Sequence, residues 1–352
     1  MPSIVLVAPA PFEARTGGYI YDRRVVDGLR RLRRTVDVLE LDASFPHPTP
    51  AALAHADRAL AAVRAGTIAI VDSLALGAMP EIITREASRL VVVALVHLPL
   101  AAAIGLNRGT AARVEDGERR ALRAAAMVIV TGRATLPLLA RYGIAPGRVV
   151  VVEPGTDRAP LAHGSRGGLE LLTVATLNPG KGHEMLLRAL AAVPDPTWRL
   201  ICAGSLTRDP VTAQRVRATT ATIGLGDRVS FVGELDGPAL AACYDRADVF
   251  VLASEQETYG MAVAEALAHG LPVVATMTGA IPELVGDDAG LLVPVGDAPA
   301  LVEALSRMLG DTGLRARCAE GARRRRDRLP TWDEASERMA AALDSIQGVT
   351  CG

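Results

Sequence analysis

Short apolar runs alternate with longer amphipathic segments along most of the chain. The runs are rich in Val, Ile and Leu and have the length of buried strands, while the segments between them repeat apolar residues at helical spacing. Such alternation is typical of βαβ units and predicts an α/β fold with parallel sheets. In the first series, strands are predicted at 3–8, 36–40, 67–71, 90–96, 126–130 and 149–152, and helices at 19–33, 51–65, 110–124 and 134–142.

A second series of the same kind begins at Leu169. Its strands are predicted at 169–175, 198–203, 228–232, 248–252, 272–275 and 290–293, and its helices at 182–192, 211–223, 237–245, 258–269 and 298–309. The stretch 153–168 between the two series is rich in Pro, Gly and polar residues, which predicts a hinge. The last segment, from Trp332 to Ile346, has a helical pattern and no strand after it.

These patterns predict two Rossmann-like domains that face each other across a deep cleft. The first domain is expected over 1–157, with a terminal helix at 332–348 packing back on it, and the second over 165–330. Ligands of open α/β sheets bind at the carboxyl ends of the strands, so the cleft is the expected binding site.

Composition narrows the classes of protein that the chain can belong to. Its 352 residues suit two domains, and aromatic residues make up only 3%, so Val, Leu, Ile and Ala must fill the cores. The net charge of −1 lacks the basic excess of a nucleic-acid-binding protein. The four cysteines form no metal or disulfide spacing, and neither a signal peptide nor a membrane-spanning run is recognised, so a cytoplasmic location is expected.

The run from Ser254 to Thr276 carries the strongest candidate chemistry. Glu257 and Glu265 are eight residues apart in a segment predicted to become helical at about Thr258, which puts both side chains on roughly one face. The predicted helix start, 258–261, offers backbone N–H groups to an anion or a hydroxyl. A solvated acidic helix face is the alternative interpretation.

Three further positions lie where predicted strands end. Lys181 stands between Gly180 and Gly182 before a predicted helix, which suits a diphosphate, although a lysine at an exposed turn is the alternative. The pair 17–18, Gly-Gly, precedes a helix expected to open at Tyr19 and lets a ligand approach the backbone, unless the turn simply needs positive φ. His97 ends an apolar strand and faces the cleft, where a structural histidine is the alternative.

Together these residues resemble the retaining nucleotide-sugar glycosyltransferases with the GT-B fold, the E-x7-E family that is glycosyltransferase family 4-like. The likeness is carried by ETYGMAVAE at 257–265, ALAHGLPVVAT at 266–276, TGAIPELV at 278–285 and GLLVPVGD at 290–297. Upstream, VEPGTD at 152–157 is similar to the interdomain motif of the family, and 173–190 to its donor-phosphate loop. In the first half the likeness rests chiefly on Gly17-Gly18 and His97.

The resemblance implies transfer of a hexose-type sugar from a UDP- or GDP-sugar to an acceptor that the sequence does not identify, with no metal and no cofactor. Lys181 and the Gly17-Gly18 turn would face the diphosphate, Glu257 the sugar hydroxyls, Glu265 the ribose, and His97 the transferred sugar or the acceptor. The expected catalytic residues are His97, Lys181 and Glu257. The expected donor-binding residues are Gly17, Gly18, Lys181, Arg208, Val232, Glu257, Thr258, Tyr259, Gly260, Met261 and Glu265.

One position departs from the family pattern. Thr176 stands where the family usually has an arginine that faces the diphosphate, and Arg208 in the next loop is a candidate substitute. Because of this departure, the alternative is that the protein is a non-catalytic relative that binds a nucleotide sugar or acts as a regulatory subunit. A Rossmann oxidoreductase is disfavoured because no G-x-G-x-x-G follows the first strand, and a GT-B epimerase because the motifs match transferases.

Two basic runs allow a second interpretation. Arginines decorate the first predicted helix, and Arg323 to Arg326 precede the last segment. Peripheral contact with anionic lipid is one explanation. A solvated helix face is favoured because acidic residues are interspersed, namely Asp22, Asp27 and Asp327.

Overall fold

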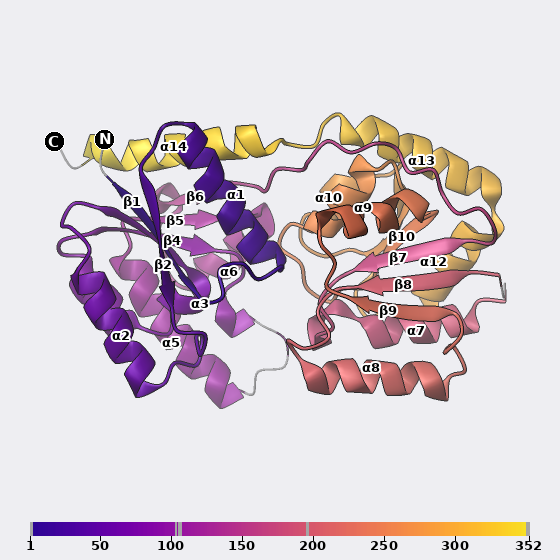
Figure 1. The fold of residues 1–352 in the computed structure, drawn as a ribbon, viewed down its shortest axis with the longest axis horizontal. Coiled ribbons are helices and arrows are strands. Elements are labelled where there is room, and N and C mark those ends of the chain that lie inside the picture. Colours follow the sequence, from indigo (N-terminus) through magenta and orange to yellow (C-terminus); the bar gives the residue numbers. More distant parts are fainter. Residues whose placement is uncertain (1–2, 103, 105–107, 195–196, 350–352) are drawn as a thin grey trace. The chain divides into compact units, whose positions relative to one another are not determined.

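The computed structural model describes residues 3–102, 104, 108–194 and 197–349. The chain divides into two compact units: unit 1 is Met1–Gly155 with Pro330–Gly352, and unit 2 is Thr156–Leu329. Each unit contains one sheet with helices packed on it (Figure 1). The change from unit 1 to unit 2 falls within the stretch 153–168 that was predicted as the hinge.

Unit 1 is built on a six-stranded sheet with the order β2-β1-β3-β4-β5-β6. All of its pairings are parallel. The strands are β1 (Ile4–Pro9), β2 (Val36–Leu41), β3 (Ile68–Asp72), β4 (Val91–Val96), β5 (Met127–Val130) and β6 (Val149–Val151). The chain steps outward from β1 to β2 and then crosses to the other side of β1 for β3, so the topological switch point lies between β1 and β3.

Helices cover both faces of this sheet. On one face α2 (Pro50–Ala61), α4 (Pro80–Glu86) and α5 (Arg108–Ala124) pack on a core of Val, Ala and Leu side chains. On the other face α1 (Gly17–Arg31) and α14 (Trp332–Val349) lie side by side. Ile4, Ile68, Leu29 and Leu343 meet there around a small void. The remaining short helices are α3 (Ser73–Leu76) and α6 (Leu136–Ala140).

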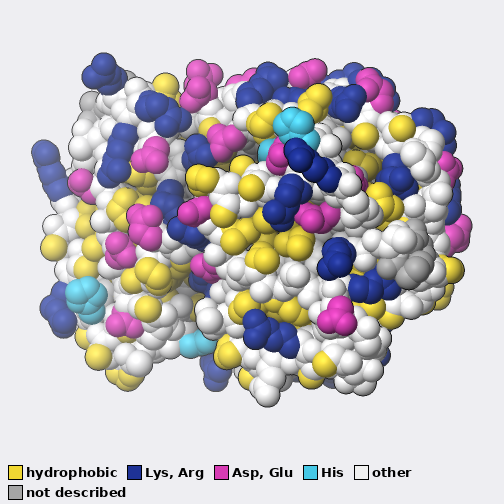
Figure 2. All heavy atoms as spheres, turned by 45° about the vertical axis from the view of Figure 1, so that its right-hand side comes forward, with side chains coloured by type: hydrophobic (Ala, Val, Ile, Leu, Met, Phe, Trp, Pro, Cys, Tyr) yellow, Lys and Arg dark blue, Asp and Glu magenta, His cyan; other side chains and the backbone are white. Residues whose placement is uncertain are grey.

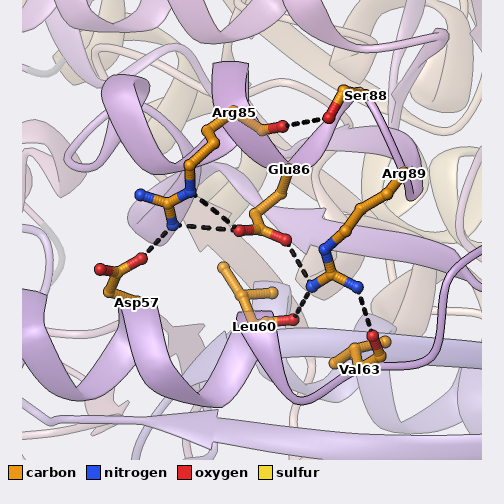
Figure 3. Close-up of polar contacts among 7 residues, drawn as sticks. All are labelled: Asp57, Leu60, Val63, Arg85, Glu86, Ser88 and Arg89. Carbon is orange, nitrogen blue, oxygen red and sulfur yellow. Dashed lines mark hydrogen bonds and ion pairs between the residues drawn. The ribbon is translucent and has the colours of Figure 1, made fainter.

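A buried carboxylate ties α4 to α2 at the end of the sheet opposite the strands' carboxyl ends (Figure 3). The Glu86 side chain is only 4% exposed, and its Oε1 atom accepts a hydrogen bond from the Arg85 guanidinium at 3.0 Å. Arg89 also pairs with Glu86 and donates to the carbonyl oxygens of Leu60 and Val63 at the end of α2. Two guanidinium groups therefore pair with this buried carboxylate, which offsets part of the cost of burying it.

The end of the chain is part of unit 1. Trp332, the first residue of α14, packs edge-on against Tyr21 at a centroid distance of 6.0 Å, and Arg24 stacks over its ring. A Cβ atom placed on Gly28 of α1 would lie 1.8 Å from the Ser336 hydroxyl oxygen of α14. The absence of a side chain at residue 28 therefore allows the two helices to approach closely.

Unit 2 has a second six-stranded sheet, with the order β12-β11-β10-β7-β8-β9 and parallel pairing throughout. The strands are β7 (Glu170–Val174), β8 (Arg199–Ala203), β9 (Val229–Gly233), β10 (Val249–Leu252), β11 (Val273–Thr276) and β12 (Gly290–Val293). The switch point of this order lies between β7 and β10.

Helices again pack on both faces. The helices α7 (His183–Ala192), α8 (Pro210–Thr222) and α12 (Ala298–Gly310) share one core with alternate strand residues, while α9 (Gly237–Arg246) and α10 (Met261–Ala268) share the other. The last two helices of the unit are α11 (Ile281–Val285) and α13 (Thr312–Arg326). As the composition predicted, both cores consist chiefly of Leu, Val, Ile and Ala.

The arginine runs make contacts within the units. On α1, Arg30 donates to the Val36 carbonyl oxygen and Arg31 pairs with Asp333 of α14. Arg34, which follows α1, pairs with Asp344 of α14. On α13, Arg324 and Arg325 bind Asp288. The face drawn in Figure 2 shows basic and acidic side chains interspersed. These contacts support internal packing over a lipid-binding role for the two runs. Among the described residues no helix is long and apolar enough to cross a membrane.

Two predicted helix starts next to candidate site residues were wrong. α1 begins at Gly17 rather than Tyr19, so Gly17 and Gly18 form its first turn. α10 begins at Met261 rather than Thr258 because Gly260, with φ of 98°, adopts a left-handed conformation that interrupts the helix. As a result, Glu257 lies in a loop, and the prediction that Glu257 and Glu265 share one helix face was also wrong.

Candidate functional site

The loops after β7 and β10 meet at the switch point of unit 2. The Glu255 N–H donates to the Gly180 carbonyl oxygen at 2.8 Å, which joins the two loops. Gly182 has φ of 64°, and a Cβ atom on it would lie 2.0 Å from the Ala253 carbonyl oxygen. Only glycine suits this position, since it satisfies both the left-handed conformation and the close approach of the two backbones.

This junction brings Lys181 and Glu257 together. Lys181 Nζ lies 2.6 Å from Glu257 Oε1, and the two side chains are 25% and 14% exposed. The buried Ser254 donates to the same oxygen at 2.8 Å. Both bonds end on Oε1, and Glu257 Oε2 has no hydrogen-bond partner within the part of the chain that the structure describes. One carboxylate oxygen is therefore held in place while the other is available to a ligand hydroxyl.

A third loop supports Glu257 from the other side. The Glu257 N–H donates to Thr278 Oγ1 at 3.2 Å, just after β11. Gly279 passes so close that a Cβ atom on it would lie 2.4 Å from the Glu257 carbonyl oxygen. Because neighbouring strands supply all three loops, the position of Glu257 depends on the sheet itself rather than on one flexible turn.

Lys181 is the only lysine in the sequence, where arginine supplies all other basic side chains except histidine. A lysine ammonium is a compact charge that can move between partners, whereas a guanidinium favours fixed, planar contacts. The only lysine ammonium group in the sequence thus lies at the switch point of unit 2.

Glu265 lies on α10 and is held separately from Glu257. Tyr244 of α9 is buried, and its hydroxyl donates to Glu265 Oε2 at 2.9 Å. The Tyr244 ring stacks on His269 with centroids 4.9 Å apart. Burial first, and then the negative charge of Glu265, raise the pKa of Tyr244 well above its ordinary value, so the hydroxyl stays protonated and continues to donate.

The other expected donor-binding residues occupy varied positions in unit 2. Tyr259 is buried in a small apolar cluster, Thr258 is half-buried, and Met261 opens α10. Val232 is 40% exposed on β9, and Arg208 is exposed in the loop between β8 and α8. The roles of Arg208 and Val232 in donor binding remain predictions.

In unit 1, His97 lies between two buried aspartates at the switch point of the sheet. Its Nε2 atom is 2.9 Å from Asp22 Oδ1 on α1 and 3.3 Å from Asp72 Oδ2 at the end of β3. Both carboxylates are almost fully buried, while the His97 side chain is 20% exposed. Among the described His, Cys, Asp and Glu side chains, these three form the one group whose potential metal-binding atoms all lie within 4.8 Å of one another.

The two aspartates change the acid–base behaviour of the histidine. Burial opposes the protonation of His97, but the charges and hydrogen bonds of Asp22 and Asp72 outweigh it and raise the pKa of His97 to about 10. Burial raises the pKa of Asp22 to about 6, against the opposing effect of His97. The sequence analysis had placed Asp22 on a solvated face, and this was wrong, because its side chain is fully buried.

Gly17 and Gly18 lie beside this cluster. Neither belongs to the described glycines with positive φ, so a turn that requires positive φ does not explain the pair. A Cβ atom on Gly18 would lie 3.3 Å from the His97 ring, which is tight. Gly18 therefore lets the first turn of α1 pack against His97.

A second buried carboxylate, which the sequence analysis missed, fixes the backbone just after His97. Glu118 of α5 accepts from the Leu100 and Ala101 N–H groups at 2.5 and 3.1 Å, and from the Tyr142 hydroxyl at 2.7 Å. Burial raises the pKa of Glu118. Its position at helical spacing from Ala121 and Leu122 on the buried face of α5 is the signal that could have identified it.

Comparisons with known proteins agree with this description. Residues 163–325 match the family model described as Glycosyl transferases group 1. The D-inositol 3-phosphate glycosyltransferase of Xylanimonas cellulosilytica is 38% identical over 165 residues, which cover 47% of this chain and 38% of that relative. The enzyme of the same name from Salinispora arenicola is 34% identical over 165 residues, 45% of this chain and 37% of the relative. The matched segment thus spans well under half the length of these relatives.

Solved structures are similar over nearly the whole chain. Sucrose-phosphate synthase from Thermosynechococcus elongatus has a TM-score of 0.85 at 22% identity, covering 99% of this chain and 100% of that one. Anabaena HepE, solved in complex with UDP and glucose, has a TM-score of 0.80 at 19% identity, covering 98% and 100%. The predicted fold class is thereby confirmed: the chain has the GT-B fold, and its residues 163–325 match the glycosyl transferases group 1 family.

Proposed function

We propose that this protein is a retaining glycosyltransferase that moves a hexose-type sugar from a UDP- or GDP-sugar to an acceptor, without a metal. The observation that carries the proposal is the Lys181–Glu257 pair at the switch point of unit 2, with Ser254 holding the same carboxylate oxygen. The family match over 163–325 and the UDP-bound structure of Anabaena HepE support a nucleotide sugar as the donor.

The cation would act on the leaving group. As the bond to the anomeric carbon breaks, negative charge builds on the departing nucleoside diphosphate, and a positioned ammonium group stabilises that charge. Lys181 lies two residues before the start of α7, whose first N–H groups are also favourable for an anion. In the ligand-free structure Lys181 pairs with Glu257, and we expect donor binding to replace that contact with the diphosphate.

The carboxylate would act on the sugar. Glu257 Oε1 is already bound by Lys181 and Ser254, and Oε2 would accept a hydrogen bond from a sugar hydroxyl. Glu265, held by Tyr244, would bind the donor ribose. The acceptor oxygen would attack the anomeric carbon on the face from which the diphosphate leaves, so the configuration is retained. The departing phosphate oxygen would take the hydroxyl proton of the acceptor.

The single lysine makes the first test direct. Reductive methylation with ¹³C-formaldehyde labels Lys181 and the N-terminal amine alone, so NMR shows one side-chain signal. We expect UDP or GDP, with EDTA present, to shift that signal, and Glu257→Gln to shift it in the absence of nucleotide. Failure of every nucleotide and nucleotide sugar to move the signal would contradict the donor site.

A measurement of turnover then distinguishes an enzyme from a non-catalytic relative. Donor hydrolysis or transfer is measured with the nucleotide that binds, and NMR of the product gives the anomeric configuration. We expect Lys181→Met to reduce kcat by about 10² to 10³-fold, the range seen when one stabilising donor is removed. The matched control, Arg188→Met, changes an exposed basic residue of α7 and should leave kcat unchanged. Nucleotide binding without turnover, together with Thr176 in place of arginine, would favour the non-catalytic relative.

A further inference from the structure

We propose that Asp22 and Asp72 are positioning residues that keep His97 as a protonated imidazolium, whose Nδ1–H group donates a hydrogen bond to a neutral hydroxyl of the ligand bound at unit 1. The inference rests on the proposed function, because it assigns the hydroxyl to the sugar or the acceptor of that reaction. It also assigns His97 a chemical role: a fixed hydrogen-bond donor rather than a general base.

The geometry fixes one nitrogen of the ring. Both carboxylates face Nε2, at 2.9 Å from Asp22 and 3.3 Å from Asp72, so this nitrogen carries a proton and shares it. The other oxygen of Asp72 accepts from the Leu74 N–H at 2.7 Å, which prevents that carboxylate from turning away. Gly18 packs against the ring from α1. The imidazole therefore has a single orientation, with its Nε2 edge buried.

The charges around the ring decide whether the second ring nitrogen of His97, Nδ1, is protonated. Two carboxylates as buried as Asp22 and Asp72 are costly without a positive charge between them, and a protonated His97 supplies it. The other groups that face the cluster are Arg23, which also favours the ionised form of Asp22, and Tyr21, whose hydroxyl is bonded to the Val152 carbonyl oxygen. The pKa of about 10 for His97 agrees with this geometry.

The exposed edge defines the ligand. Nδ1 has no hydrogen-bond partner among the residues that the structure describes, and the side chain is partly exposed at the carboxyl end of β4. The two carboxylates beside the ring disfavour a phosphate at this point, because the imidazolium balances only one of them and the Arg23 guanidinium donates to the carbonyl oxygens of Phe12 and Ala14. A neutral hydroxyl accepts a hydrogen bond from Nδ1–H without that repulsion.

The first measurement needs no substrate. ¹³Cε1-labelled histidine reports the protonation of each of the six histidines in the full chain, and His97→Gln identifies the signal of His97. We expect wild-type His97 to remain protonated from pH 6 to pH 9. Asp72→Asn should lower its pKa by about one to three pH units, the effect of removing a nearby opposite charge, and Asp22→Asn should do the same.

Controls separate this effect from misfolding and from metal binding. Asn is as good an N-cap as Asp, so Asp72→Asn preserves the start of α3. Asp297→Asn changes a comparable N-cap in unit 2 and should leave the His97 signal unmoved. A wild-type His97 that titrates near pH 6.5 would overturn the proposal. So would stoichiometric metal in the purified protein whose removal by EDTA shifts the signal.

The second measurement uses the proposed activity. Wild-type kcat/KM should be flat between pH 7 and pH 9, while in Asp72→Asn it should fall as pH rises, with its midpoint at the pKa of His97 measured by NMR. A merely structural aspartate would lower activity equally at every pH. Wild-type activity that rises as His97 loses its proton would identify a base and overturn the inference. If no transfer is found at all, the NMR result still decides the state of His97.

Discussion

Single residues at the two switch points hold most of the candidate chemistry. In unit 2 the pair Lys181 and Glu257 comes from loops after β7 and β10, and in unit 1 His97 and Asp72 come from the ends of β4 and β3. Neighbouring parallel strands end at the same edge of a sheet, so residues distant in sequence meet there. The fold thus explains why side chains 76 residues apart form an ion pair.

Gly182 offers a test at this scale. We expect Gly182→Ala to destabilise unit 2 because the new methyl group would meet the Ala253 carbonyl oxygen in addition to straining a φ of 64°. Gly224→Ala is the matched control, since its φ of 73° is similar but nothing lies within 4 Å. The control should lose about 1–2 kcal/mol of unfolding free energy, and Gly182→Ala about 1–3 kcal/mol more. Urea unfolding followed by Trp198 fluorescence measures both, and equal losses would contradict the close contact.

The sequence predicted some of these residues and missed others for physical reasons. Lys181 and Glu257 stand in motif-like loops flanked by glycine, and their neighbourhood was predictable from the strands before them. Asp22 was misassigned because arginines surround it, although its spacing to Val25, Val26 and Leu29 places it on the buried stripe of α1. Tyr244 acts through a contact with another helix, which leaves no local pattern. Glu118 was missed although its spacing to Ala121 and Leu122 places it on the buried face of α5.

At the scale of elements, all twelve predicted strands are present, and their ends agree with the prediction to within one residue. Four helices received no predicted range, and one of them, α11, has only five residues. α3 and α4 are short, and Gly77 and Pro80 interrupt the apolar pattern around them. α13 has few apolar residues and buries only Cys318, Gly321 and Ala322, so no hydrophobic stripe identifies it. Hydrophobic patterns locate helices with a broad apolar face. They miss helices that are short or that bury few apolar side chains.

The pairing of α1 with α14 gives a prediction for elements. An alanine inside a helix is usually more stable than glycine by about 0.5–1 kcal/mol. Gly28→Ala should instead destabilise unit 1, because the methyl group would collide with Ser336. Gly310→Ala on α12, where nothing lies within 4 Å, is the control and should not destabilise the protein. Thermal unfolding followed by Trp332 fluorescence measures the effect, and a stabilised Gly28→Ala would show that the helices do not pack as described.

At the scale of the whole molecule, the two units contain histidines with opposite responses to pH. His97 in unit 1 has a pKa raised from 6.5 to about 10, so its stabilising effect is complete below pH 6.5 and is lost as pH rises through about 10. His183 in unit 2 is buried, and its pKa is lowered to about 4. It binds a proton more readily when unfolded, so unit 2 loses stability as pH falls below about 6.5.

Each unit also contains one tryptophan, Trp332 or Trp198, which makes this difference measurable. With Trp332→Phe the fluorescence reports unit 2, and with Trp198→Phe it reports unit 1. We expect unit 2 to lose stability between pH 6.5 and pH 4.5 by up to about 1.4 kcal/mol per pH unit from His183. The same loss should be absent in His183→Asn.

We expect unit 1 to lose stability between pH 7 and pH 10, and His97→Gln to remove that dependence on pH. Identical slopes in the variants and their parents would refute the assignment.

Unit 1 is assembled from both ends of the chain, whereas unit 2 is one uninterrupted segment. During synthesis the ribosome therefore makes all of unit 2 before it makes α14, the helix that packs on α1. Unit 1 therefore stays incomplete, with the apolar side of α1 uncovered, until α14 emerges. A stalled nascent chain in which an unstructured linker replaces the residues after 329 and spans the exit tunnel should accordingly contain a protease-resistant second unit and a first unit that is still open to digestion.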